Sequence, residues 1–257
     1  MPTYEHPPTL FIDGRWVNPA GSGVIDVIDP ATEKVIGHVP NGSAADVDAA
    51  VHAARGAFDP LISVDERRDR LHLVIDAMEK RLPDIAHLIT AEMGAPPVRI
   101  AETVQTQVPL AVAKGFADAL DGFAFEERIG NSLVLREPYG GVVGAITPWN
   151  YPLYQVVAKV LPAIAAGCTV VLKPSNDAPP LSVFAFVEAC EEAGLPPGVI
   201  NIVSGPGQVI GERLASHPRC RLRVLHRVHR CRVARRRIGR SIDQEGRARA
   251  GGANRPM

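Results

Sequence analysis

The spacing of apolar residues changes along the first 218 positions of the chain. Short apolar stretches bounded by turn-forming residues come first, at Thr9–Trp16, Val24–Ile28 and Glu33–Val39. Stretches of this length with such boundaries are typical of strands. From Ser43 to Leu120 the apolar residues instead recur every three or four positions, as they do on one face of a helix. We therefore predict a strand-rich start followed by a series of helices.

We predict four helices in this second part. Ser43 and Asp46 have the spacing of a capping box and would begin the first helix. Asp65 would cap the second, the third would end at Gly94, and Arg99–Leu120 would form the fourth. We expect two acidic residues of this part to be solvated or structural, namely Glu92 and Glu102.

The pattern changes again in Gly140–Ser175. Two continuous apolar runs, Val142–Ile146 and Thr169–Leu172, flank the longer apolar segment Leu153–Ala166. Short apolar runs of this kind are typical of parallel strands buried on both faces, and the middle segment is long enough for a helix. A further helix at 181–193 and a strand at 199–203 follow. The sequence therefore predicts an α/β fold built on a parallel sheet, with the helices packed on it.

Two loops with unusual residues follow the central strands. The first reads Thr-Pro-Trp-Asn-Tyr-Pro, at 147–152, and the second begins Lys-Pro-Ser, at 173–175. Ligands of open α/β sheets bind outside the carboxyl ends of the strands, so these loops form the candidate site. The glycines of Gly205–Gly211 have the spacing G-x-G-x-x-x-G, which only approximates the dinucleotide-binding pattern and is weak evidence by itself.

These segments resemble the NAD(P)-dependent aldehyde dehydrogenase superfamily. The resemblance lies in Pro-Trp-Asn-x-Pro at 148–152, AAGCTVVLKPS at 165–175 and GLPPGVINIVSGPGQVIG at 194–211. It covers residues 9–218 and less than half of a typical family member. It implies a partial aldehyde dehydrogenase-like fold, with an incomplete Rossmann-type parallel sheet and helices on both of its faces.

The resemblance implies a site for NAD or NADP at the two loops. Trp149 would lie beside the nucleotide, Lys173 would hydrogen-bond the adenosine ribose, and Gly207 would let the adenine approach closely. Asn176 stands where many NAD-preferring members carry a glutamate, whose charge repels a 2′-phosphate. The amide makes NADP acceptable, although Asp177 follows directly. The residues expected to bind the cofactor are Ile146, Thr147, Pro148, Trp149, Lys173, Ser175, Asn176 and Gly207.

The reaction implied by the resemblance is oxidation of an aldehyde to a carboxylic acid through a cysteine thiohemiacetal. Asn150 would donate an amide N–H to the oxyanion and is the one catalytic residue expected here; the alternative is that it only holds its loop. Cys168 begins a buried strand and Cys190 lies in a helix, so neither is expected to be the nucleophile. The family's catalytic cysteine and glutamate base come later than any segment that resembles the family.

Composition narrows the class of protein. The chain is 46% hydrophobic and 22% charged, as globular proteins are, and its apolar stretches are too short to span a membrane. Its four cysteines have neither metal-site nor disulfide-dense spacing, so we expect no metal site and a reducing, cytoplasmic setting. The N-terminus has no basic region followed by an apolar run, which predicts no signal peptide.

Charge divides the chain at residue 218. Residues 219–257 contain 13 arginines, no lysine and two acidic residues, a net charge of +11, whereas residues 1–218 carry −11. We therefore expect an incomplete cofactor-binding domain at 1–218 and a disordered arginine-rich tail at 219–257. Arginine-rich sequence without lysine is typical of a GC-rich gene that is translated out of frame.

A one-base shift tests that interpretation on paper. Permitted codons for Arg219–Arg232, shifted by one base, can read DVDFVSFTGSTGAG, and those for Gln244–Gly252 can read KKVALELGG. Both resemble family segments, the first a glycine-rich helix start that receives the pyrophosphate and the second the segment with the glutamate base. We therefore predict a chain truncated by a frameshift, without dehydrogenase activity of its own.

Two other functions fit parts of the sequence. The basic tail could neutralise phosphates in a nucleic-acid-binding protein, but it contains no aromatic residue to stack on bases, so no specific nucleic acid is expected. Phe123–Arg128 and Leu133–Arg136 predict a hairpin with exposed edges. In the family a hairpin at this place is part of an oligomerisation arm; an edge hairpin of the same domain is the alternative. Through the 123–136 hairpin the chain could form homo-oligomers or act as a regulatory partner of an intact dehydrogenase.

Overall fold

A computed structural model describes residues 7–136, 141–220 and 222–225 of the chain. The chain divides by its internal contacts into one unit, Met1–Val224, and a second unit, Leu225–Met257. Nearly all of the described residues belong to the first unit, which contains the predicted α/β segments.

Among the described residues, six strands form the main sheet, in the order β10-β7-β8-β9-β1-β2. β7 (Val142–Ile146), β8 (Thr169–Lys173) and β9 (Ile200–Ile202) are parallel to one another. β1 (Leu10–Ile12) pairs antiparallel with β9, and β2 (Arg15–Val17) pairs antiparallel with β1. The predicted α/β fold with a partial parallel sheet is confirmed.

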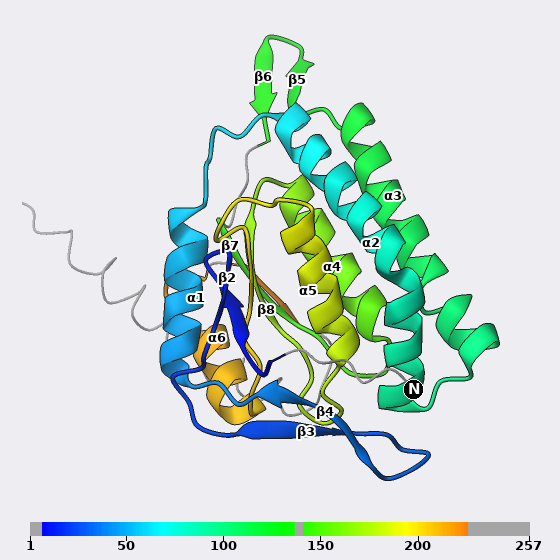
Figure 1. Cartoon of the computed structure of the whole chain (residues 1–257). Helices are drawn as coiled ribbons and strands as arrows, with labels where there is room; N and C mark the ends of the chain where they lie inside the picture. The colour runs from blue at the N-terminus through cyan, green and yellow to red at the C-terminus, as the bar shows by residue number, and fades with distance from the viewer. Residues whose placement is uncertain (1–6, 137–140, 221, 226–257) are drawn as a thin grey trace, which may run out of the picture. The chain divides into compact units, whose positions relative to one another are not determined.

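Helices cover both faces of this sheet (Figure 1). One face carries α1 (Ala44–Gly56) and the short helix α6 (Glu212–Ser216). The helices on the other side are α2 (Val64–Met93), α3 (Gln107–Gly122), α4 (Pro152–Ala165) and α5 (Leu181–Glu192).

Alternate residues of the central strands supply two separate cores. Val142 and Val171 pack with the α1 side, whereas Val143, Ala145 and Leu172 pack with the α2–α5 side. This alternation follows from the pleat of a strand, in which successive side chains point to opposite faces. Because both faces are covered, the strands are apolar throughout, as the sequence indicated.

α2 differs from the prediction because it is one helix of 30 residues, where we expected two. Ser63 is its N-cap and forms a capping box with Glu66, so Asp65 is not the cap. Pro83 lies inside the helix without ending it. The apolar stripe keeps its phase across Pro83, and burial of that stripe outweighs the loss of one helical hydrogen bond.

Two other segments are also divided differently. The fourth predicted helix is split into a π-helical segment, η1 (Pro97–Glu102), and α3. The first predicted strand, Thr9–Trp16, is a hairpin that turns at Asp13–Gly14, since β1 ends at Ile12 and β2 begins at Arg15. Aspartate followed by glycine is a common hairpin turn, and this signal in the sequence was missed.

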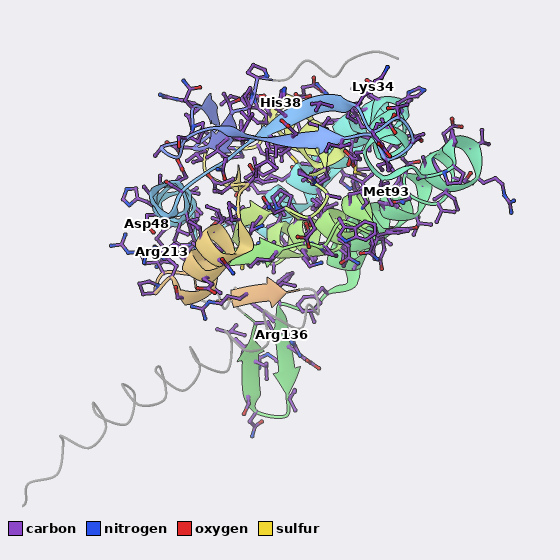
Figure 2. The ribbon with its side chains drawn as sticks, turned by 90° about the horizontal axis from the view of Figure 1, so that it is seen from below. Lys34, His38, Asp48, Met93, Arg136 and Arg213 are labelled. Carbon is purple, nitrogen blue, oxygen red and sulfur yellow. The ribbon has the colours of Figure 1, made fainter. Side chains whose placement is uncertain are left out.

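Two small antiparallel sheets complete the described structure. β3 (Val24–Ile28) pairs with β4 (Val35–Pro40), and β5 (Glu126–Ile129) pairs with β6 (Ser132–Leu135). The β5–β6 hairpin confirms the prediction for 123–136 and projects from the rest of the fold (Figures 1 and 2). An ion pair between Arg136 and Glu127 braces its base.

β10 (Leu222–Leu225) lies next to β7 at the edge of the sheet. The expectation that the whole of 219–257 is without regular structure is therefore wrong for these four residues. Cys220, just before β10, is buried in the same core as Val142. The rest of the tail, from residue 226, lies outside the described residues. Among the residues described, no helix is long and apolar enough to cross a membrane.

Candidate functional site

The two loops singled out in the sequence meet at the carboxyl edge of the sheet. β7 and β8 pair in register so that Ile146 lies opposite Lys173, the last residue of each strand. The backbone N–H of Thr147 donates to the carbonyl of Lys173 over 3.0 Å. The structure therefore brings together the starts of the 147–150 and 174–176 loops, as the α/β rule predicts.

Two oxygen atoms in these loops are buried and have no hydrogen-bond partner among the residues that the structure describes. They are Oγ1 of Thr147 and Oδ1 of Asn176. A buried polar atom without a partner costs about 1–3 kcal/mol, and such atoms are rare in folded proteins. Two of them at neighbouring strand ends indicate a place where a ligand with hydrogen-bond donors would fit.

Lys173 lies inside the fold at this edge, with 3% of its surface exposed. Its Nζ donates to the carbonyl of Pro174 over 2.8 Å, so the ammonium group reaches the second loop. The methylene chain of Lys173 passes close to Gly211, because a Cβ built on that glycine would lie 3.8 Å from the lysine Cδ. Lys173 therefore connects the strand end with the glycine segment after β9.

The glycine segment after β9 turns tightly at Gly205. Gly205 has φ +140°, and a Cβ there would lie 2.8 Å from Cγ1 of Ile210. Gly207 begins the π-helical segment η2 (Gly207–Gly211) and is exposed, with open space where its Cβ would be. The turn thus depends on Gly205, whereas Gly207 leaves room at the surface.

Trp149 and Asn150 are exposed at the end of the first loop, Trp149 by 46% of its surface. The next residue, Tyr151, anchors the loop, because its hydroxyl donates to the carbonyl of Val104 over 3.0 Å. Its ring packs edge-on against Tyr154, and burial raises the pKa of the Tyr151 phenol. Asn150 is therefore held next to a fixed side chain, and as a residue it is exposed to solvent.

The described cysteines do not lie in an accessible site. Cys168, Cys190 and Cys220 are all buried. Burial raises the pKa of the Cys190 and Cys220 thiols, so neither is poised as a thiolate nucleophile. The buried positions of Cys168 and Cys190 agree with the packing roles predicted for them. Cys231 lies outside the described residues.

Lys159 is a buried ionisable group that the sequence reasoning did not consider. It lies in α4, where its Nζ donates to the backbone carbonyl and to Oε1 of Gln155, over 3.0 and 2.8 Å. Burial lowers the pKa of the Lys159 ammonium group. A single lysine within the apolar segment Leu153–Ala166 was the available signal.

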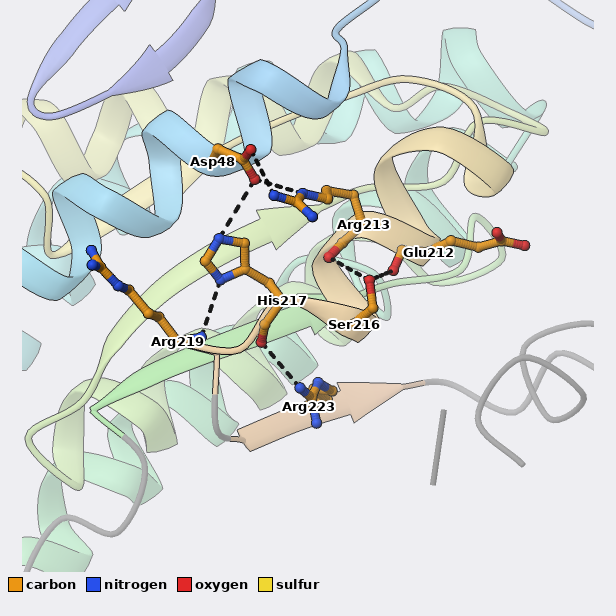
Figure 3. Close-up of polar contacts among 7 residues, drawn as sticks. All are labelled: Asp48, Glu212, Arg213, Ser216, His217, Arg219 and Arg223. Carbon is orange, nitrogen blue, oxygen red and sulfur yellow. Dashed lines mark hydrogen bonds and ion pairs between the residues drawn. The ribbon is translucent and has the colours of Figure 1, made fainter. Parts of the chain in front are cut away.

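A polar cluster fixes α6 on α1 (Figure 3). Arg213 makes two hydrogen bonds to the carboxylate of Asp48, over 2.6 and 2.8 Å, and lowers the pKa of that carboxyl group. The Nε2 atom of His217 lies 3.5 Å from the same carboxylate. These contacts hold the end of the glycine segment in place without forming part of the loop edge.

Comparison with known proteins identifies the family. A model of the aldehyde dehydrogenase family matches residues 16–225. The chain belongs to the aldehyde dehydrogenase family. Its match runs past residue 218, where we placed the end of the resemblance, and includes β10. The resemblance stated from the loop motifs is confirmed, and its C-terminal boundary is corrected.

Individual members of the family are similar over the same region. A 3-succinoylsemialdehyde-pyridine dehydrogenase of a Pseudomonas species is 48% identical over 211 residues, which cover 81% of this chain and 44% of that protein. Aldehyde dehydrogenase C of Pseudomonas syringae, solved with NAD+ and octanal, has TM-score 0.80 and 43% identity, over 84% of this chain and 44% of that one.

A betaine aldehyde dehydrogenase of Staphylococcus aureus, solved with NAD+, has TM-score 0.78 and 31% identity, again over 84% of this chain and 44% of its own. The chain therefore spans less than half the length of each of these three relatives.

Proposed function

We propose that the carboxyl edge of β7 and β8 binds NAD or NADP, and that this chain corresponds to the cofactor-binding part of an enzyme that oxidises aldehydes. The observation that carries the proposal is the pair of buried, unpartnered oxygens, Oγ1 of Thr147 and Oδ1 of Asn176. The relatives solved with NAD+ give it support.

The residues at this edge suit a dinucleotide. Ribose hydroxyl groups can donate hydrogen bonds, which is what the unpartnered oxygens need. Lys173 supplies a positive charge at the base of the edge, and the exposed ring of Trp149 offers a flat apolar surface for a base. Gly207 leaves open space beside them. Ile146, Pro148 and Ser175 would complete the wall.

Asn176 is the residue expected to influence the choice between NAD and NADP. Its amide has no charge to repel a 2′-phosphate, and the nearby carboxylate of Asp177 is exposed to solvent, where screening weakens it. We infer that this edge accepts both cofactors.

The chemistry proposed for Asn150 is stabilisation of an oxyanion. When bound, the dinucleotide supplies the hydride acceptor for aldehyde oxidation. The amide N–H of Asn150 would donate to the carbonyl oxygen of the substrate as it gains negative charge. One such donor contributes about 3 kcal/mol to the transition state where water is excluded. Asn150 is exposed in this chain, so the full contribution requires a further part of an enzyme to cover it. As an exposed residue, Asn150 suits this role better than that of a loop anchor, which Tyr151 already performs.

We further propose that this polypeptide does not oxidise aldehydes itself. In the described part of the chain no accessible cysteine accompanies Asn150, and each of the three cysteines there is buried. Purified protein given a panel of aldehydes with NAD or NADP is expected to produce no reduced cofactor. Steady production of reduced cofactor would contradict the proposal.

We retain a reading-frame shift near Pro218–Arg219 as our explanation for the arginine-rich tail, although the family match runs seven residues past Pro218 in the present frame. It is supported by the two family-like segments that a one-base shift yields from the codons. Resequencing the DNA of this region tests it. Reads that support the present frame, with codons that cannot give those two segments, would end the hypothesis.

The cofactor proposal predicts a specific effect of Thr147→Val. Without the hydroxyl, NAD binding should weaken about 5–10-fold, because one hydrogen bond to the ligand is lost. The free protein should be as stable as before or more stable by about 1 kcal/mol, because an unpartnered buried oxygen is removed. Isothermal titration with NAD and urea unfolding measure the two effects.

A matched control for this test is Asn18→Ala, at an exposed residue far along the chain from both loops. It should change neither the affinity nor the stability. If the unaltered protein binds neither NAD nor NADP, or if Thr147→Val binds NAD as tightly as the unaltered protein does, the proposed site is wrong.

A further inference from the structure

A hollow of ≈ 330 Å³ opens between α2 and the start of α3, among residues that form no part of the candidate cofactor edge. Its floor consists of buried side chains that are mostly apolar, Leu82, Ala86, Thr106 and Leu110. Its rim consists of exposed residues, Glu79, Pro83, His87, Glu102 and Gln107. The volume lies at the small end of the range of about 300–1,000 Å³ that is usual for small-molecule sites.

Pro83 explains why the helix surface is open here. Proline has no backbone N–H, so the carbonyl of Glu79 loses the donor that residue 83 would normally give it. Ala86, nearly one turn later, adds only a methyl group to the floor. The α2 wall of the hollow therefore presents a small apolar surface, formed by Pro83 and Ala86.

The charged groups of the rim are of one sign. Glu79 and Glu102 both line the hollow, and neither lysine nor arginine is among its lining residues. Glu79 is paired with Lys114 over 3.1 Å. Within the described residues, the carboxylate of Glu102 forms no ion pair or hydrogen bond. The rim therefore presents one uncompensated carboxylate beside an apolar floor, and this arrangement is complementary to a cation with an apolar body.

We infer that the α2–α3 hollow binds a primary alkylammonium ion. The ammonium group would donate to the carboxylate of Glu102 at the rim, and the alkyl chain would cover Ala86 and Leu110 on the floor. A primary ammonium fits better than a quaternary one because the groups at the rim are mainly acceptors, which need N–H donors. This inference does not depend on the proposed cofactor site.

Three probes with the same alkyl chain test the inference by isothermal titration against the full chain. Hexylammonium is expected to bind most tightly, hexyltrimethylammonium more weakly, and hexanoate not at all. Glu102→Gln should weaken hexylammonium binding about threefold, because the charge pairing at an exposed carboxylate is lost. Glu102 is exposed, so the thermal unfolding midpoint of this variant should stay unchanged.

Asp84→Asn is the matched control. Asp84 is an exposed acid on the same helix, next to Pro83, and it does not line the hollow. This variant should bind hexylammonium as the unaltered protein does, whereas Ala86→Leu should abolish binding by filling the floor. The inference is overturned if Glu102→Gln retains full affinity, if Asp84→Asn loses as much, or if hexanoate binds as well as hexylammonium.

Discussion

At the scale of single residues, Glu92 carries the clearest pH dependence in the structure. It is 6% exposed, and its carboxylate accepts hydrogen bonds from the backbone N–H and the hydroxyl of Ser182 at the start of α5. In the part of the chain that is described, no cation pairs with it. Burial outweighs the two hydrogen bonds and raises the pKa of Glu92 to about 7.

The sign of the effect follows from this raised pKa. Glu92 contributes stability while it is protonated in the folded state, and that contribution is lost as the pH rises from about 4.5 toward 7. The shift corresponds to about 3 kcal/mol. We expect Glu92→Gln, which stays neutral, to show a smaller decrease in unfolding free energy between pH 5 and pH 8 than the unaltered protein does.

Urea unfolding at several pH values measures this difference. Other titrating groups affect both proteins equally, so the difference between the two curves isolates residue 92. Glu126→Gln, at an exposed acid of the β5–β6 hairpin, serves as the control and should leave the pH profile unchanged. Parallel profiles for Glu92→Gln and the unaltered protein would contradict the prediction, because they would show that ionisation of Glu92 does not lower the free energy of unfolding.

Predictions for single residues were right where the helical spacing of apolar residues, or the spacing within a motif, indicated the role of the residue. Glu92 follows Leu88 and Ile89 on the buried face of α2, so its structural role agrees with the prediction, as does the exposure of Glu102. The missing partners of Thr147 and Asn176 could not be predicted. Whether a buried oxygen finds a donor depends on the three-dimensional path of the neighbouring loops.

At the scale of elements, the contact between β7 and the segment before β10 depends on a glycine. A Cβ on Gly144 would lie 2.9 Å from Sγ of Cys220 and 3.1 Å from Cγ of Leu214. We expect Gly144→Ala to reduce the unfolding free energy by about 1–3 kcal/mol through overcrowding. Urea unfolding of the single variant measures the loss.

A double-mutant cycle tests the cause of that loss. Cys220→Ala removes the sulfur atom, so Gly144→Ala should cost less in that background than in the unaltered protein, by at least 0.5 kcal/mol. The contact of the new Cβ with Leu214 would remain, and rescue should be partial. Strictly additive effects would mean that Cys220 does not occupy this place beside β7.

The order of elements could be predicted because each apolar stretch has the period of its own structure. For this reason, the predicted ends of the central strand–helix–strand unit lie within one residue of those in the structure. The edge of the sheet could not be predicted. β1 joins β9 across almost the whole unit, and Asn201 accepts the N–H of Asp13 over 3.0 Å, a contact without any local signal in the sequence.

At the scale of the whole molecule, the projecting β5–β6 hairpin is the feature that needs a partner. Leu133 and Leu135 lie on the same face of β6, and each is 56% exposed. An isolated two-stranded hairpin is marginal in water, and exposed leucines beside unpaired strand edges favour association. We propose that the hairpin joins copies of this chain, or this chain and a full-length family member.

Size-exclusion chromatography with light scattering tests this proposal. The unaltered chain should have a mass above that of a monomer, and the mass should increase with concentration. The double variant Leu133→Lys, Leu135→Lys should be monomeric at the same concentrations, because lysines on this face repel one another across the interface.

The control is Leu61→Lys, at a leucine that is 88% exposed and lies outside the hairpin. It should associate as the unaltered chain does. Neither set of substitutions touches the buried core, so urea unfolding at low concentration should give similar free energies for all three proteins. An unaltered chain that stays monomeric at every concentration, or a hairpin variant that still associates, would exclude the hairpin as the contact between copies.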